Sequence, residues 1–181
     1  MSADTRIASR YAKSLLSLAV EQNVLEELYN DMQLVRETLN NRDFKLFVKS
    51  PIIKPDKKQT VFSKVLGASV SEMAQSFFNI LTRKGREMYL PEIVDEFIRQ
   101  YKKHKHITEV KLTTAQAMSE NALAAITKVL QESKATDEKV EITTETNADL
   151  IGGFVIEMED KLYDASIAHK LDEARKNFTR L

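Results

Sequence analysis

The spacing of apolar and polar residues along this chain changes within one stretch, Lys102-Lys-His-Lys-His106-Ile-Thr-Glu-Val-Lys-Leu-Thr-Thr114. Its first five residues are polar and carry no apolar stripe, whereas apolar and polar residues alternate from His106 to Thr114. Alternation with a period of two, in a segment rich in Thr and Val, predicts a β-strand. We therefore expect one domain in residues 1–105 and a second, of different architecture, in residues 106–181.

Before this stretch, apolar residues recur at intervals of three and four, which is the spacing of a buried helical stripe. The clearest helix is predicted from Leu25 to Leu39. A helix over residues 4–20 is expected from the same spacing. Four more are expected from start or stop signals: one capped by Asp43 and stopped by Pro51, one with Pro55 in its first turn, one opened by a capping box at Ser69–Glu72 and ended by Gly85, and one begun by Pro91. Such helices with short connections predict a six-helix bundle.

After the stretch, helical and alternating patterns are mixed. Further strands are expected at residues 139–144, 151–158 and 161–164, and a helix is expected to follow Ser119 as its cap. The chain closes with a predicted helix whose apolar positions are Ile167, Leu171, Ala174 and Phe178. This order predicts a small α/β domain, so the fold class is mostly α with a smaller α+β part.

Composition narrows the function classes. The 181 residues include no Cys, so disulfides and thiolate chemistry are excluded, and no run approaches the roughly 20 apolar residues that span a bilayer. The chain start has no apolar signal core, so we expect a cytosolic protein without a transit peptide.

The net charge of the chain is zero, but residues 1–105 hold 18 Lys/Arg against 13 Asp/Glu, and residues 106–181 hold 9 Lys/Arg against 14 Asp/Glu. Opposite signs favour two partners, although chance and surface solubility explain them equally well.

No residue pattern points to catalysis or to a metal. The three histidines, His104, His106 and His169, lie near no nucleophile signature, and Lys103 and Lys105 flank the first two and would repel a cation. We predict no catalytic, cofactor-binding or metal-binding residue.

Three other features have plainer explanations. Gly152-Gly153 opens a predicted strand and lacks the frame of a phosphate-binding loop, so a bend is expected there. The acidic run Glu157–Asp160 has no ligand spacing and is expected to be a solvated turn. A basic patch of Lys49, Lys54, Lys57 and Lys58 lacks interleaved aromatic residues in a neutral chain, which argues against nucleic-acid binding.

Three segments carry a specific combination of motifs. They are Arg10-Tyr-Ala-Lys-Ser-Leu15; Phe47-Val-Lys-Ser-Pro51 with Lys57-Lys58; and Asp149-Leu-Ile-Gly-Gly-Phe-Val155, followed by Asp160-Lys161, Tyr163-Asp-Ala-Ser166 and Leu171. In order and spacing they resemble the ATP synthase delta subunit family, whose mitochondrial relative is the oligomycin-sensitivity-conferring protein. The similarity spans nearly the whole chain.

The resemblance implies a non-catalytic stator subunit of the F-type ATP synthase, present once per complex at the cytoplasmic face of the bacterial membrane. It implies that the N-terminal bundle holds the N-terminal helix of an alpha subunit between its first and fifth helices. It also implies that the C-terminal domain binds the C-terminal end of the b subunits. The alternatives are a helical adaptor or regulator unrelated to ATP synthase and, third, an enzyme.

Candidate residues follow from the resemblance together with the apolar stripes. Expected anchors for the alpha-subunit helix are Tyr11, Ser14, Leu15, Leu18, Phe77, Phe78 and Leu81. Adjacent helical residues point about 100° apart, so only one of Phe77 and Phe78 is expected to face the groove. Each stripe residue could instead belong to the bundle core. The C-terminal family signature, expected to be structural, comprises Leu150, Ile151, Gly152, Gly153, Phe154, Asp164 and Ser166.

Overall fold

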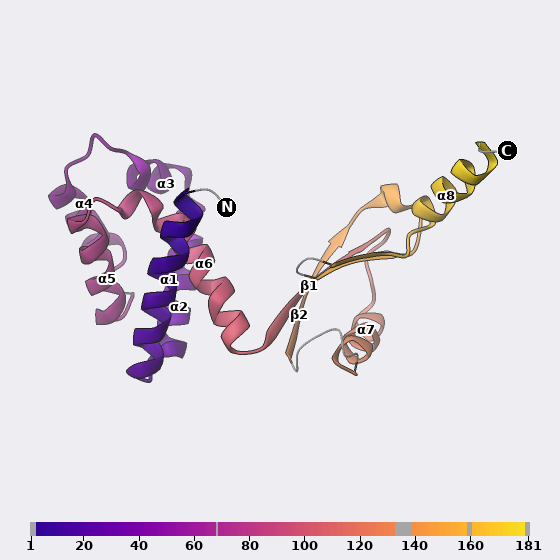
Figure 1. Cartoon of the computed structure of the whole chain (residues 1–181), viewed down its shortest axis with the longest axis horizontal. Coiled ribbons are helices and arrows are strands. Elements are labelled where there is room, and N and C mark those ends of the chain that lie inside the picture. The colour runs from indigo at the N-terminus through magenta and orange to yellow at the C-terminus, as the bar shows by residue number, and fades with distance from the viewer. Residues whose placement is uncertain (1–2, 68, 133–138, 159–160, 180–181) are drawn as a thin grey trace. The chain divides into compact units, whose positions relative to one another are not determined.

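The computed structural model describes residues 3–67, 69–132, 139–158 and 161–179 (Figure 1). The chain forms two compact units that divide between Lys102 and Lys103. This division lies inside the polar stretch that the sequence singles out and three residues before the expected boundary. The described residues are mostly helical and include one small sheet, in agreement with the predicted fold class.

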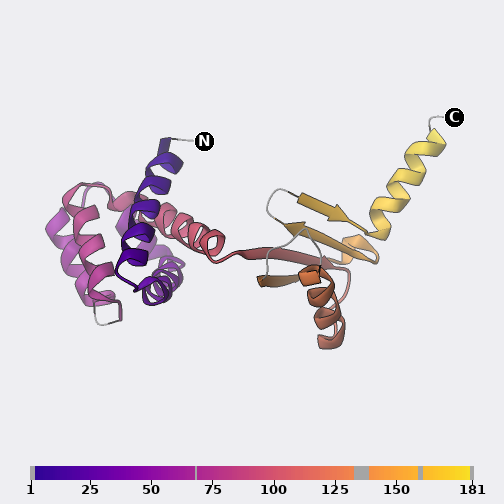
Figure 2. The same ribbon diagram turned by 60° about the horizontal axis from the view of Figure 1, so that its bottom comes forward.

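The N-terminal unit is helical (Figures 1 and 2). Its elements are α1 (Ala3–Glu21), α2 (Leu25–Leu39), α3 (Arg42–Lys49), α4 (Pro55–Val65), α5 (Glu72–Arg83), the 3-10 turn η1 (Glu87–Tyr89) and α6 (Leu90–His104). Pro55 occupies the first position of α4, where its missing N–H costs nothing because that group has no partner within a helix. Gly85 follows α5 with a φ of +62°, a left-handed conformation that glycine adopts without strain.

Two predicted helix caps are wrong. The cap of α5 is Ser71, whose hydroxyl accepts a hydrogen bond from the Ala74 amide, because Ser69 already belongs to the turn that closes on Leu66. The cap of α3 is Asn41 rather than Asp43, which already lies within the helix. In both cases the true cap is the residue with extended backbone immediately before the helix, as capping geometry requires.

The core of the N-terminal unit is built on α6. Ile93, Val94 and Phe97 on this helix are fully buried, together with Met32 and Val35 of α2. Helix α5 adds its buried face and packs against α2 and α4. The outer face of α1, which includes the 42% exposed Leu18, remains at the surface.

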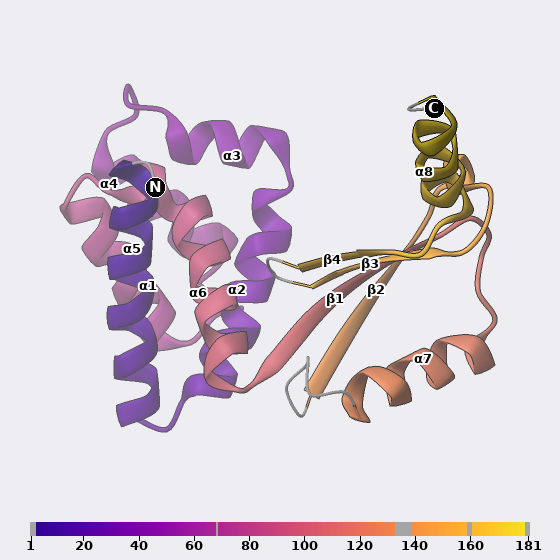
Figure 3. The same cartoon turned by 45° about the vertical axis from the view of Figure 1, so that its right-hand side comes forward.

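The C-terminal unit contains a four-stranded sheet with the order β2-β1-β3-β4 (Figure 3). Its elements are β1 (Ile107–Thr114), α7 (Glu120–Glu132), β2 (Lys139–Thr146), the 3-10 turn η2 (Ala148–Leu150), β3 (Phe154–Met158), β4 (Lys161–Asp164) and α8 (Ile167–Thr179). Strands β1 and β2 are parallel, and α7 makes the crossover between them. The β1–β3 and β3–β4 pairs are antiparallel.

One face of this sheet carries the core of the unit. Val110 and Leu112 of β1, Ile156 of β3 and Leu130 of α7 are buried together. The third strand begins at Phe154 and not at residue 151 as expected, because η2 and the glycine pair occupy the preceding residues. Helix α8 leaves the end of the sheet at which η2 lies (Figures 1 and 2). The sequence predicts Phe178 as an apolar position of this helix, but its side chain is not among those that the structure describes.

Candidate functional site: a groove between α1 and α5

Helix α1 carries two apolar stripes that are offset by one residue. The inner stripe is Ala8, Ala12, Leu15 and Ala19, and all four residues are buried. Its three alanines let α1 approach the bundle closely, because they hold little volume between the helices. The outer stripe is Ile7, Tyr11, Ser14 and Leu18, in which Ser14 is the one polar residue. This second stripe faces a surface groove whose opposite wall is α5.

The groove has a volume of about 440 Å³. It is lined by Ile7, Arg10, Tyr11, Ser14, Leu15 and Leu18 of α1, by Phe77 and Ile80 of α5, and by Arg86 just beyond α5. A second hollow of about 320 Å³ shares Leu15, Leu18, Phe77 and Ile80 with the first and extends it to Gln22, Glu72, Met73 and Ser76. Because the two hollows share four lining residues, they form one continuous groove, which we call the α1/α5 groove.

The α1/α5 groove is apolar and open to solvent. Ile80 and Leu18 are 51% and 42% exposed, respectively, which is high for large aliphatic side chains that face each other across two helices. Below them, the rings of Tyr11 and Phe77 meet edge to face with centroids 6.4 Å apart. This aromatic pair forms the floor of the groove, and the exposed side chains of Leu18 and Ile80 form its rim.

Five of the seven predicted anchors line this groove, namely Tyr11, Ser14, Leu15, Leu18 and Phe77. Phe78 and Leu81 do not line it and are only 3% and 1% exposed. The reason is the helical step of about 100°, which turns Phe78 toward Phe62 of α4, 5.9 Å away between ring centroids. Sequence reasoning missed Ile80 as a groove residue, although its spacing of three from Phe77 places it on the same face.

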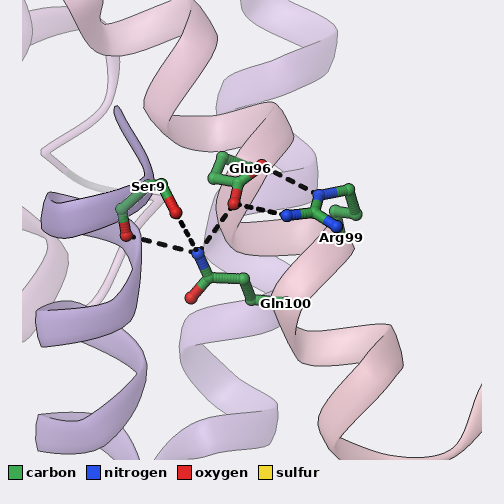
Figure 4. A network of polar contacts seen from close by, with 4 residues as sticks. All are labelled: Ser9, Glu96, Arg99 and Gln100. Carbon is green, nitrogen blue, oxygen red and sulfur yellow. Dashed lines mark hydrogen bonds and ion pairs between the residues drawn. The ribbon is translucent and has the colours of Figure 1, made fainter. Parts of the chain in front are cut away.

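A polar network holds α1 in position as one wall of the groove (Figure 4). The side-chain amide of Gln100 on α6 donates to the backbone oxygen of Ser9 at 3.2 Å and to the Glu96 carboxylate at 2.8 Å. Arg99 also donates to Glu96, at 2.7 and 2.9 Å. The Arg99 hydrogen bond, with smaller contributions from Gln100 and Ser9, lowers the pKa of Glu96 to about 2, against the opposing effect of burial.

In the C-terminal unit, the glycine pair of the family signature forms a tight joint with the start of α8. A Cβ on Gly153 would lie 2.4 Å from the Ala165 oxygen, and its φ is +78°. A Cβ on Gly152 would lie 2.6 Å from the Ile167 side chain, and its own oxygen accepts the Ile167 amide at 2.9 Å. At Gly153 only glycine fits, because φ is positive and the atom in the way is a backbone oxygen, whereas at Gly152 the close atom is the end of the Ile167 side chain.

Asp164 and Ser166 complete the same joint. Ser166 is buried and caps α8, since its hydroxyl accepts the His169 amide at 3.1 Å. The Asp164 carboxylate accepts the Ser166 amide at 2.9 Å, and hydrogen bonds from Ser166 hold the pKa of Asp164 below its ordinary value. The remaining signature residues flank the joint. Leu150 ends η2, and Ile151 follows it with a φ of +64°. The backbone oxygen of Phe154 accepts a hydrogen bond from the Ala165 amide.

The described residues can also be compared with the requirements of a metal site and of a membrane span. Within residues 3–67, 69–132, 139–158 and 161–179, no group of three or more His, Asp or Glu side chains is placed to hold a metal ion. No helix in the same residues is both long and apolar enough to cross a membrane.

Known proteins resemble this chain over almost its whole length. Residues 7–178 match the family model described as ATP synthase delta (OSCP) subunit. The chain is 36% identical to ATP synthase subunit delta of Cytophaga hutchinsonii over 177 residues, which cover 97% of this chain and 96% of that protein. It is 34% identical to the chloroplastic ATP synthase subunit delta of Ochrosphaera neapolitana, over 92% of this chain and 93% of the relative.

The chain belongs to the ATP synthase delta (OSCP) subunit family. Delta (OSCP) subunits are structural subunits of the peripheral stalk and not catalytic ones, so this chain is a stator subunit and not an enzyme. An adaptor unrelated to ATP synthase is no longer favoured.

The fold is that of the delta (OSCP) family as well. A chain in the cryo-EM structure of the Toxoplasma gondii mitochondrial ATP synthase hexamer superimposes with a TM-score of 0.76. The match covers 99% of this chain and 98% of that one at 20% sequence identity. At so low an identity the similarity establishes the fold alone.

Proposed function

We propose that this delta (OSCP) subunit clamps the catalytic head of the ATP synthase to its peripheral stalk, so that the head does not rotate with the central stalk. The N-terminal unit, acting as a six-helix bundle domain, binds the N-terminal helix of an alpha subunit in the α1/α5 groove. The C-terminal unit binds the C-terminal end of the b subunits. One copy serves each complex, at the cytoplasmic face of the bacterial cell membrane, without crossing that membrane.

The observation that carries this proposal is the open apolar groove between two helices. Leu18 and Ile80 expose aliphatic surface on its rim, and Tyr11 and Phe77 supply its floor. A groove of this kind suits an amphipathic helix that inserts apolar residues at intervals of three and four. Removing apolar surface from water contributes about 25 cal/mol per Å², before the entropic costs of association.

The contact with b subunits is supported by the outer surface of the C-terminal unit. Ile167 and Leu171 lie four residues apart on α8 and are both exposed. The glycine joint and the Ser166 cap fix the start of this helix against the sheet. A helix that is anchored at its base, with an apolar edge exposed, suits a second helical partner.

Titration calorimetry of the full chain with a peptide of the alpha subunit's N-terminal helix, from the same organism, tests the groove. We expect saturable one-to-one binding that Ile80→Asp abolishes, because the partner's apolar surface would then cover an unpaired charge. The matched control is Val65→Asp on α4, which changes an aliphatic residue of similar exposure, 47%, outside the groove. Equal loss of binding in both variants, or no binding by the well-folded wild-type protein, would refute the assignment of the groove.

A further inference from the structure

The α1/α5 groove has charges of opposite sign at its two ends. Arg10 and Arg86 line the hollow that also contains Ile7, near the start of α1. Glu72 lines the hollow that contains Gln22, just beyond the end of α1. Because α1 and α5 run in opposite directions along the groove, the end of α5 joins the start of α1 at the basic end. The same arrangement brings the start of α5 to the acidic end.

These end charges are available to a partner. Arg10, Arg86 and Glu72 are exposed, and the ion pairs formed among the described side chains involve none of the three. The apolar lining between the two ends includes Leu15, Leu18 and Phe77. The groove therefore offers an apolar centre with a free positive end and a free negative end.

The two ends are far enough apart to act separately. From Arg10 to Gln22 the groove follows α1 for about 12 residues, or about 18 Å at a rise of 1.5 Å per residue. This separation exceeds the Debye length of about 8 Å at physiological ionic strength. Each end thus attracts its own counter-charge, and the order of charges along a bound helix affects its affinity.

We infer that the α1/α5 groove selects an amphipathic helix of three to four turns with acidic side chains at the Arg10/Arg86 end and a basic side chain at the Glu72 end. The inference rests on the proposed function, in which the occupant is the alpha subunit's N-terminal helix. Apolar burial supplies most of the affinity, whereas the charge order fixes the register of the helix and speeds its association.

The test is a charge reversal with a matched control on the same helix. The variant Arg10→Glu/Arg86→Glu inverts the basic end, whereas Lys13→Glu makes the same kind of change at an exposed α1 position that does not line the groove. Binding of the alpha-subunit peptide is measured by calorimetry in low salt and again in 0.5 M NaCl. A second peptide, with its Asp and Glu residues changed to Asn and Gln, is titrated in parallel.

We expect the double reversal to weaken binding about ten-fold or more in low salt, with a much smaller loss in high salt and in the Lys13→Glu control. The neutralised peptide should bind wild-type protein more weakly and should not distinguish it from the double variant. Tight binding of the acidic peptide by the double variant would overturn the charge inference and leave the groove assignment intact. Absence of peptide binding by the wild-type protein would overturn the proposed function, and the charge inference with it.

Discussion

Replacing Lys58 with methionine tests how a buried ion pair stabilises the N-terminal unit. Lys58 lies on α4 and is only 1% exposed, which is exceptional for a lysine. Its ammonium group donates to a Glu87 carboxylate oxygen at 2.9 Å and to the Val48 backbone oxygen at 2.9 Å. One side chain therefore ties together the end of α3, the helix α4 and the turn η1.

The expected cost follows from what the substitution leaves behind. Without Lys58, the Glu87 carboxylate would be a buried charge without its counter-ion, and its second oxygen has no hydrogen-bond partner among the described atoms even now. Removing one member of a buried pair typically costs about 3–5 kcal/mol, out of a total stability of about 5–15 kcal/mol. Removing both, in Lys58→Met/Glu87→Leu, should cost much less, because no buried charge then remains unpaired.

The assay is urea unfolding followed by far-UV circular dichroism, in which the helical N-terminal unit dominates the signal. With a urea m-value of about 2 kcal/mol/M, the midpoint of Lys58→Met should fall by about 2 M. Lys57→Met is the matched control, because Lys57 is the exposed neighbour on the same helix and should leave the midpoint unchanged.

Two results would refute this reasoning. A midpoint shift below about 0.5 M for Lys58→Met would mean that the pair contributes little to stability. A double variant as unstable as the single one would mean that lost packing, and not an unpaired Glu87, is the cause.

Three further predictions follow from individual positions. Leu81→Asp should destabilise the chain by several kcal/mol and lower its thermal midpoint sharply, whereas Ile80→Asp should leave the midpoint nearly unchanged, because only Leu81 is buried. The lowered pKa of Glu96 means that its stabilisation is complete above its ordinary value of 4.5 and is lost as the pH falls toward 2. Glu96→Gln should therefore lower stability by about 1–2 kcal/mol near neutral pH and flatten the acid-unfolding curve between these values. Gly153→Ala should destabilise the C-terminal unit by about 1–3 kcal/mol in thermal unfolding while leaving alpha-subunit peptide binding unchanged, because its Cβ would strike the Ala165 oxygen.

Local sequence determined most of the secondary structure and the family. Helical periodicity, Pro55 and Gly85 define elements whose stabilising interactions lie within a few residues, so no knowledge of the fold is required to predict them. The change to alternation near His106 likewise marks the division of the chain within a few residues. Of the two glycines in the signature, Gly153 has a positive φ and a backbone oxygen in the place of a Cβ, which explains why glycine is found there.

Only the tertiary structure decided which residues are available for function. Phe78 and Leu81 have the same apolar character as Phe77, and their assignment to the core depends on the rotation of α5 against α4. Lys58 belongs to a run that the sequence presents as a basic surface patch, yet the fold buries it because Glu87, 29 residues away, supplies a counter-charge. The convergence of Arg10 and Arg86 at one end of the groove likewise results from the antiparallel packing of two helices. Sequence patterns report short-range periodicity, whereas burial and charge pairing between distant segments exist only once the chain has folded.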